Sequence, residues 1–157
     1  MTKTNAVRLV EKAALPCRFA EYAYDENDLN GMHAAEGIGM PAEQVFKTLV
    51  ARNEANQFYV FCVPVCCELD LKKAAAASAS KKIEMLQVKE LLPVTGYIRR
   101  GCSPVGMKKQ FPTFIDETAV LYDEIAVSAG ARGFQMILAP DDLISFAAMV
   151  PADLTKM

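Results

Sequence analysis

The sequence has a single histidine, His33, and five cysteines that follow no Cys-x-x-Cys spacing. A lone histidine argues against most histidine-ligated metal centres and against catalytic triads built on histidine. An odd number of scattered cysteines fits free thiols in a reducing compartment better than a disulfide framework or a zinc site. We therefore expect neither a metal nor a cofactor.

Long apolar runs are also missing. The longest, residues 58–67, is too short to span a bilayer and has polar flanks. Residues 1–13 are charged at once and show neither the apolar core nor the cleavage site of a signal peptide. No repeat, linker or low-complexity segment divides the 157 residues. The sequence predicts one cytoplasmic domain over residues 1–157, with its core from about 4 to 149 and no membrane contact.

The net charge of −2 is distributed unevenly. Residues 71–110 hold nine Lys and Arg against two Glu, whereas the rest of the chain is acidic. This asymmetry favours a basic face that meets a polyanion, with phosphate as the leading group. The alternative is a set of amphipathic helices whose lysines are only solvated.

Hydrophobic periodicity and turn signals predict one α+β domain around a mixed sheet. Strands are expected at 18–24, 46–52, 57–65, 82–86, 113–116, 125–128 and 134–138, the second and third forming a hairpin. Helices are expected at 6–14, 32–37, 40–44, 69–79, 89–93 and 141–149, with Asp70 capping the fourth. Residues 151–157 are expected to be frayed.

Residues 95–114, TGYIRRGCSPVGMKKQFPTF, contain three glycines, two prolines and four basic side chains. So many chain-bending residues exclude a long helix and leave backbone N–H groups that secondary structure does not consume. Gly101 would let the backbone approach a ligand closely and donate to a carbonyl or an oxyanion. An ordinary solvated surface loop is the alternative.

Two side chains are candidates for chemistry. Lys47 interrupts a segment otherwise apolar enough for a central strand, so it either faces solvent or lies in a cleft that takes an anionic or carbonyl group. Cys102 is a candidate nucleophile because nearby Arg99, Arg100 and Lys108 would stabilise its thiolate. The sequence offers no general base beside it, however. The turn 128–133 is either a second ligand-binding turn or a simple hairpin turn.

Several ordered motifs resemble one family. FKTLVAR, ELDLKKAA, KKIEML, LLPVTGYIRRGCSPVGMKK, PTFIDE and VSAGARGFQ are similar to the YbaK/EbsC aminoacyl-tRNA deacylases, relatives of the editing domain of bacterial prolyl-tRNA synthetases. The likeness runs from about residue 4 to residue 143. It implies a compact α+β fold with a mixed, barrel-like sheet, and hydrolysis of mischarged tRNA, above all Cys-tRNA(Pro). It also implies prolyl-tRNA synthetase as a partner.

The resemblance assigns roles to particular residues. Lys47 matches the family's essential lysine, which contacts the phosphate at the tRNA 3′ end. Gly101 matches a glycine whose N–H faces the substrate carbonyl, Ser128 the serine of a VSGG-type turn, and Tyr22 an aromatic residue of the pocket. The implied substrate-binding residues also include Cys102, Ser103, Pro104, Gly130 and Arg132. The implied contacts to the tRNA acceptor end are Lys72, Lys73, Lys81, Lys82, Arg99, Arg100, Lys108 and Lys109.

The family's reaction needs no general base, because the thiol of a cysteinyl ester attacks its own carbonyl and forms a cyclic thioester. Cys102 and Arg100 depart from the GGISP motif common in the YbaK branch, which leaves the amino-acid preference open. Three alternatives remain. The chain could be a deacylase for alanyl or other small aminoacyl esters that uses an activated water. It could also be a non-catalytic tRNA-binding or regulatory module, or a thiol enzyme that depends on Cys102.

Overall fold

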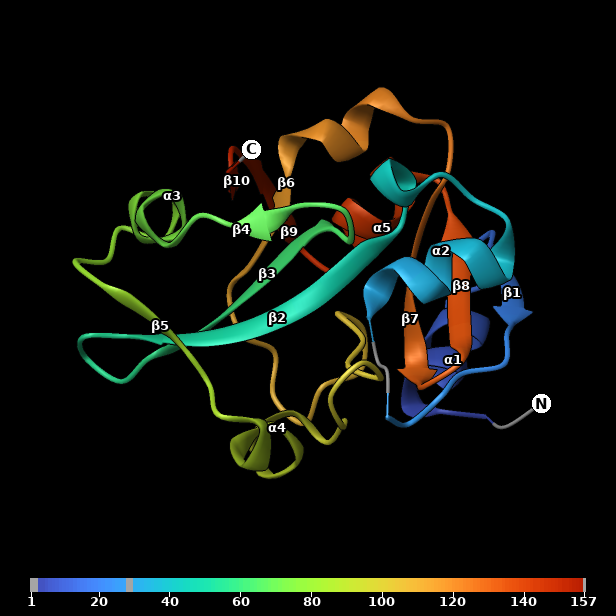
Figure 1. Cartoon of the computed structure of the whole chain (residues 1–157), viewed down its shortest axis with the longest axis horizontal. Coiled ribbons are helices and arrows are strands. Elements are labelled where there is room, and N and C mark those ends of the chain that lie inside the picture. Colours follow the sequence, from blue (N-terminus) through green and yellow to red (C-terminus); the bar gives the residue numbers. More distant parts are fainter. Residues whose placement is uncertain (1–2, 28–29, 157) are drawn as a thin grey trace.

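The computed structural model describes residues 3–27 and 30–156, which form two main β-sheets with short helices around them (Figure 1). The larger sheet has the strand order β5-β2-β3-β6-β9 and the smaller one the order β1-β8-β7. The strands of the larger sheet, in that order, are Ile83–Met85, Phe46–Asn53, Phe58–Pro64, Thr113–Asp116 and Met149–Ala152. Those of the smaller sheet are Arg18–Glu21, Phe134–Leu138 and Ile125–Ala131.

The larger sheet is mixed. Strand β2 runs antiparallel to β3 and β5, whereas β6 runs parallel to β3 and β9. The two sheets meet where Val45, just before β2, forms a parallel bridge with Ala126 of β7. The predicted α+β class and mixed sheet are confirmed. Over the described ranges the strands form separate sheets and do not close into a barrel. A short third sheet pairs β4 (Glu68–Leu69) with β10 (Thr155–Lys156).

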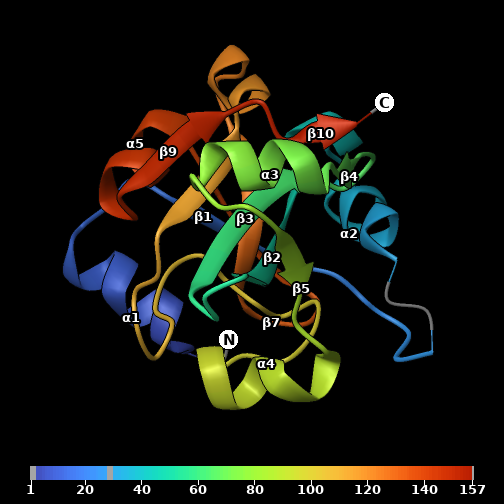
Figure 2. The ribbon, with the colours of Figure 1, turned by 90° about the vertical axis from the view of Figure 1, so that its left-hand side faces the viewer.

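Five α-helices of seven or eight residues are described: α1 (Asn5–Lys12), α2 (Gly31–Ile38), α3 (Leu71–Ala77), α4 (Val88–Thr95) and α5 (Pro140–Phe146). Asp70 caps α3 as predicted, since its carboxylate accepts from the N–H groups of Lys72 and Lys73 at 2.9 and 3.1 Å. Short 3₁₀ helices cover Ala42–Gln44 and Glu117–Leu121. Helices α3 and α4 lie at opposite ends of β5 (Figure 2).

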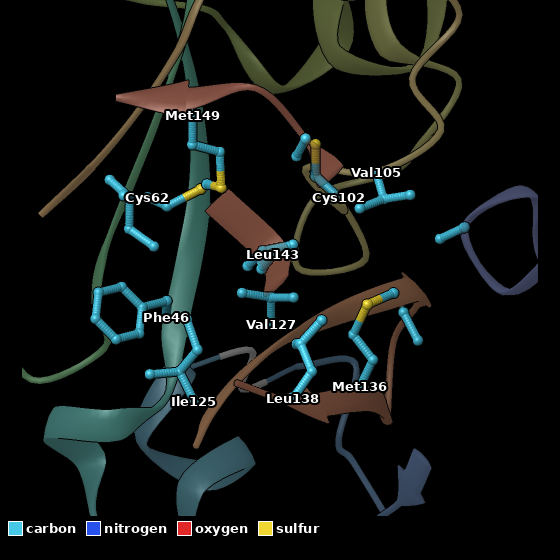
Figure 3. Packing of buried hydrophobic residues seen from close by; sticks show 14 of the residues in the cluster. Phe46, Cys62, Cys102, Val105, Ile125, Val127, Met136, Leu138, Leu143 and Met149 are labelled. Carbon is cyan, nitrogen blue, oxygen red and sulfur yellow. The ribbon is translucent and has the colours of Figure 1, made fainter. Parts of the chain in front are cut away.

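The largest hydrophobic core fills the space between the two sheets (Figure 3). It brings together Phe46 of β2, Ile125 of β7, Met136 of β8, Leu143 of α5 and Met149 of β9. Because both sheets contribute to one core, β2 is held rigidly beside β7. A second, smaller core lies under α3. Among the described residues no helix combines the length and apolarity needed to cross a membrane.

The prediction for the end of the chain was wrong. The expected helix over 141–149 ends at Phe146, and residues expected to be frayed form β9 and β10. Strand β9 pairs with β6, and Leu154, fully buried, donates its N–H to the Asp116 carboxylate at 3.0 Å. These contacts join segments more than thirty positions apart, which local sequence patterns do not reveal.

Candidate active site

One cavity of about 340 Å³ opens beside β2 and takes its walls from segments far apart in the sequence. They are β2 itself, the β7–β8 hairpin, α2, the β5–α4 segment and the loop at 99–102. The packing of β2 beside β7 thus places loop residues around a fixed wall, the usual arrangement of a binding site.

The cavity collects most of the residues predicted to act on substrate. Its lining includes Tyr22, Lys47, Cys102, Ser128 and Arg132, together with Arg99 and Arg100. Four of these seven side chains are cationic, and none of the described lining residues carries a carboxylate. An anionic ligand is therefore the chemistry that this cavity fits.

Lys47 lies in β2, opposite Val63 of β3, and its half-buried side chain reaches the cavity. The alternative of a lysine that only faces solvent is thus not what the fold shows. Burial, followed by the nearby positive charge of Arg100, lowers the pKa of Lys47, while Glu68 acts in the opposite direction. A bound anion would raise the pKa of Lys47 again and stabilise its charged form.

Arg100 is the second half-buried cation of the cavity. Its backbone adopts the left-handed region, with φ of 68°. Burial and the neighbouring charge of Arg99 lower its pKa, and its Nε has no hydrogen-bond partner among the described residues. Arg132 holds this loop in place by donating from Nε to the Arg99 carbonyl oxygen at 2.9 Å. The loop that carries these charges is therefore fixed to the β7–β8 hairpin.

Gly101 is buried in the wall and does not line the cavity. Its N–H donates to the carbonyl oxygen of Ile98 at 2.9 Å. A Cβ at this position would lie 3.2 Å from the backbone nitrogen of Arg132, so close packing against the hairpin explains the glycine. A role of the Gly101 N–H toward the substrate carbonyl stays a prediction.

Three other residues predicted to bind substrate do not line the cavity. Ser103 is fully buried, and its Oγ accepts from the N–H of Val105 at 3.2 Å. Pro104 lines a different hollow, beside α1 and α5. Gly130, with φ of 102°, packs against Thr4, where an added Cβ would clash. These three residues shape the loops around the cavity without reaching into it.

Ser128 and Gln135 form a cross-strand pair on β7 and β8, and both line the cavity. The Ser128 hydroxyl oxygen accepts from the N–H of Gly130 at 3.1 Å, which fixes the bulge between Ser128 and Ala131. Tyr22 follows β1 and donates its backbone N–H to the Gly133 carbonyl at 2.9 Å. The β7–β8 hairpin thus positions this side of the cavity, formed by Tyr22, Ser128 and Gln135.

The Cys102 thiol is buried, and burial raises its pKa to about 12. A thiol with such a pKa is neutral near pH 7 and is a poor nucleophile. The expected stabilisation of its thiolate by neighbouring cations does not outweigh burial. This finding speaks against a thiol enzyme that depends on Cys102.

The remaining predicted tRNA contacts lie outside the cavity. The Lys73 ammonium donates to the Asp153 carboxylate at 3.0 Å and to the Thr155 carbonyl at 2.7 Å. Lys72, Lys81, Lys82, Lys108 and Lys109 are exposed. Their contact with tRNA stays a prediction.

Gln135 was not among the residues predicted from the sequence, although it lines the cavity. Gln135 is 5% exposed in a strand whose other residues are apolar, FQMIL. A polar side chain in a buried strand is itself a signal of a site. That signal could have marked Gln135 from the sequence.

Known proteins resemble this chain over most of its length. A sequence profile of the aminoacyl-tRNA editing domain matches residues 32–146. Over 153 residues the chain is 47% identical to an Enterococcus faecalis protein named as a candidate Cys-tRNA(Pro)/Cys-tRNA(Cys) deacylase, EbsC, covering 98% of this chain and 93% of that protein. It is 26% identical to the uncharacterised protein YwhH of Bacillus subtilis, over 73% of this chain and 72% of the other.

A solved structure shows the same fold. The crystal structure of a candidate trans-editing enzyme for prolyl-tRNA synthetase superposes with a TM-score of 0.86, at 24% identity and over 100% of both chains. Together with the profile and the E. faecalis relative, this match confirms the resemblance drawn from the sequence motifs.

Proposed function

This chain belongs to the family of aminoacyl-tRNA editing domains, and from that premise we propose that it hydrolyses the ester bond of mischarged Cys-tRNA(Pro). The name of its E. faecalis relative supports this substrate. The observation that carries the proposal is the cavity lined by four cations and, among its described residues, by no carboxylate. A tRNA 3′ end brings a phosphate beside its aminoacyl ester, and the cavity complements that phosphate.

Lys47 binds the phosphate or the ribose at the 3′ end in this proposal. Its lowered pKa and half-buried position support the assignment, since the free cavity holds positive charges that a phosphate would compensate. Arg100, beside Lys47, contributes to the same positive field. The loop around Gly101 reaches the substrate carbonyl through its lining residues Arg99 and Arg100, and Ser128 fixes the shape of the hairpin wall.

The chemistry is supplied by the substrate. The cysteinyl sulfur attacks its own ester carbonyl carbon, the carbon–sulfur bond forms and the bond to the ribose oxygen breaks. The thiol proton ends on that ribose oxygen, which leaves as the hydroxyl of free tRNA. Water then opens the cyclic thioester to give cysteine. The protein's part is to orient the ester and to stabilise the oxyanion, for which it needs no nucleophile of its own.

Deacylation of Cys-tRNA(Pro), Ala-tRNA(Pro) and Ser-tRNA(Pro) tests the proposal. We expect rapid cleavage of the cysteinyl ester alone, and its loss in Lys47→Ala. Cleavage of all three esters would show that an activated water, and not the substrate thiol, attacks the ester carbonyl. Full activity of Lys47→Ala would remove the central role of that residue. Binding of tRNA without cleavage of any ester would show a non-catalytic module.

A further inference from the structure

Buried polar atoms without a partner are rare in folded proteins, and two of them belong to residues that line this cavity. Over the described ranges three buried side-chain nitrogen or oxygen atoms lack a hydrogen bond: Nε of Arg52, Nε of Arg100 and Oε1 of Gln135. The last two belong to residues that line the cavity. One is a donor and the other an acceptor, so a ligand with one group of each kind would satisfy both.

Gln135 is held in place by its neighbours. It stands opposite Ser128 in the β7–β8 pair and is 5% exposed. Burial raises the pKa of Tyr22, and the neighbouring Gly133 N–H, Gln135 amide and Arg100 charge act in the opposite direction. The side-chain amide of Gln135 therefore lies beside Tyr22. Its Oε1 has no hydrogen-bond partner among the described residues and is left for a ligand.

The strands separate Lys47 from Gln135. Val45, just before β2, forms a bridge with Ala126 of β7, and Ser128 of β7 pairs with Gln135 of β8, so β7 lies between the start of β2 and β8. Both Lys47 and Gln135 line the cavity. If Lys47 takes the 3′-terminal phosphate, a different part of the substrate reaches Gln135, and the part next to that phosphate is the aminoacyl group.

We propose that Oε1 of Gln135 accepts a hydrogen bond from the α-amino group of the aminoacyl ester. An α-amino ester carries a donor amine next to an acceptor carbonyl, and the Gln135 Oε1 and Arg100 Nε pair complements those two groups. A neutral amide suits this place, because a carboxylate here would pair with Arg100 and neutralise it. The inference rests on the proposed function, since it takes the ligand to be an aminoacyl ester.

Two tRNA(Pro) esters test the contact in a double-mutant cycle. One carries cysteine, and the other carries 3-sulfanylpropionate, which keeps the reacting thiol but lacks the amine. Gln135→Met removes the amide with little change in volume. Gln110→Met is the matched control, because Gln110 is exposed and bonds to the Ala147 carbonyl, away from the cavity.

We expect Gln135→Met to lower kcat/KM for the cysteinyl ester about tenfold, the effect of one missing hydrogen bond in a desolvated site. The same variant should lower kcat/KM for the sulfanylpropionyl ester about tenfold less, because the loss of the contact with Tyr22 affects both esters alike. The different intrinsic reactivity of the two esters cancels in this comparison. An equal loss on both esters, or no loss on either, would overturn the inference, because the amide would then not contact the amine.

A binding measurement separates this inference from the proposed function. The probes are stable adenosine 3′-amides that carry either an alanyl or a propionyl group, titrated by calorimetry. We expect the wild-type protein to prefer the alanyl amide about tenfold and Gln135→Met to lose that preference. A protein that shows the preference but cleaves no ester would refute deacylation and keep the contact. Equal affinity for both amides, or binding of neither, would refute the contact.

Discussion

The structure places two groups of basic residues, which look alike in the sequence, in different surroundings. The cavity group consists of Lys47, Arg99, Arg100 and Arg132, and no described lining residue gives it a carboxylate partner. The outer group consists of Lys72, Lys73, Lys81 and Lys82, around α3 and just before β5. Its side chains lie toward solvent, and Lys73 is paired with Asp153.

The difference shows which positive charges the fold holds for a ligand. Burial lowers the pKa of both Lys47 and Arg100, so keeping them charged costs folding free energy. Such a cost is typical of functional sites, whereas exposed and paired lysines on a surface contribute little in either direction. Four predictions test this difference, in order of decreasing effect.

Removing a charge from the cavity group should separate activity from stability. Arg100→Met is expected to lower kcat/KM for Cys-tRNA(Pro) by about 10- to 100-fold, the range of one missing charge-assisted hydrogen bond. The melting temperature should stay the same or rise, because a desolvated cation without a partner at its Nε is gone. Deacylation kinetics and thermal unfolding measure the two effects. Arg8→Met, on exposed α1 surface, is the control. Unchanged activity, or a fall of activity together with stability, would contradict the assignment.

A neutral residue of the same cavity should behave differently. Cys102→Ala is expected to lower the free energy of unfolding by about 1 kcal/mol, an ordinary effect for a core truncation, and to leave most activity. Because burial raises the Cys102 pKa to about 12, the wild-type rate should show no inflection from this thiol between about pH 6 and 9. Denaturant unfolding and a pH–rate profile test this. Complete loss of activity in the variant would restore the thiol-enzyme alternative.

The parts of this fold that depend on neighbouring residues were predictable from the sequence. The β2–β3 hairpin follows from two β-rich runs around a polar turn, and the Asp70 cap follows from one residue before a helix. Strands β9 and β10 were missed because their partners, β6 and β4, lie far back in the chain. Their formation depends on long-range pairing that no local periodicity encodes.

The candidate site divides in the same way. Lys47 was found as a charge in an apolar strand segment, and Tyr22 and Ser128 through family motifs. The fold brings all three to one cavity. The importance of Gln135 depends on its register with Ser128 and on a partner that Oε1 lacks. The sequence marks Gln135 only as a polar residue among apolar ones, and these two properties appear only in the fold. The charge count over residues 71–110 likewise placed Arg100 and Lys73 together, although the fold gives them opposite surroundings.

The outer group should affect tRNA affinity without changing the chemical step. Lys72→Gln combined with Lys81→Gln is expected to weaken tRNA binding by a few fold, and to reduce the slope of log K against log salt by about 0.7–0.9 for each phosphate that is no longer neutralised. The rate at saturating tRNA should not change. Lys12→Gln, at the exposed end of α1, is the control. An unaltered salt slope would show that these lysines are only solvated. A fall in the rate at saturating tRNA would show that the outer lysines also act on the chemical step, as the cavity cations are expected to do.

The smallest effect is expected at the pair that joins Lys73 to Asp153. Asp153→Asn removes a salt bridge between exposed side chains, and Lys73 keeps its hydrogen bond to the Thr155 carbonyl. We therefore expect the melting temperature to stay within experimental error. The Lys73 ammonium, no longer neutralised, should then raise tRNA affinity slightly, and Lys73→Gln in the same background should cancel that gain. If tRNA still binds more tightly after Lys73→Gln is added, Asp153 itself repels the tRNA. The salt bridge to Asp153 would then not explain why Lys73 contributes less than the cavity cations.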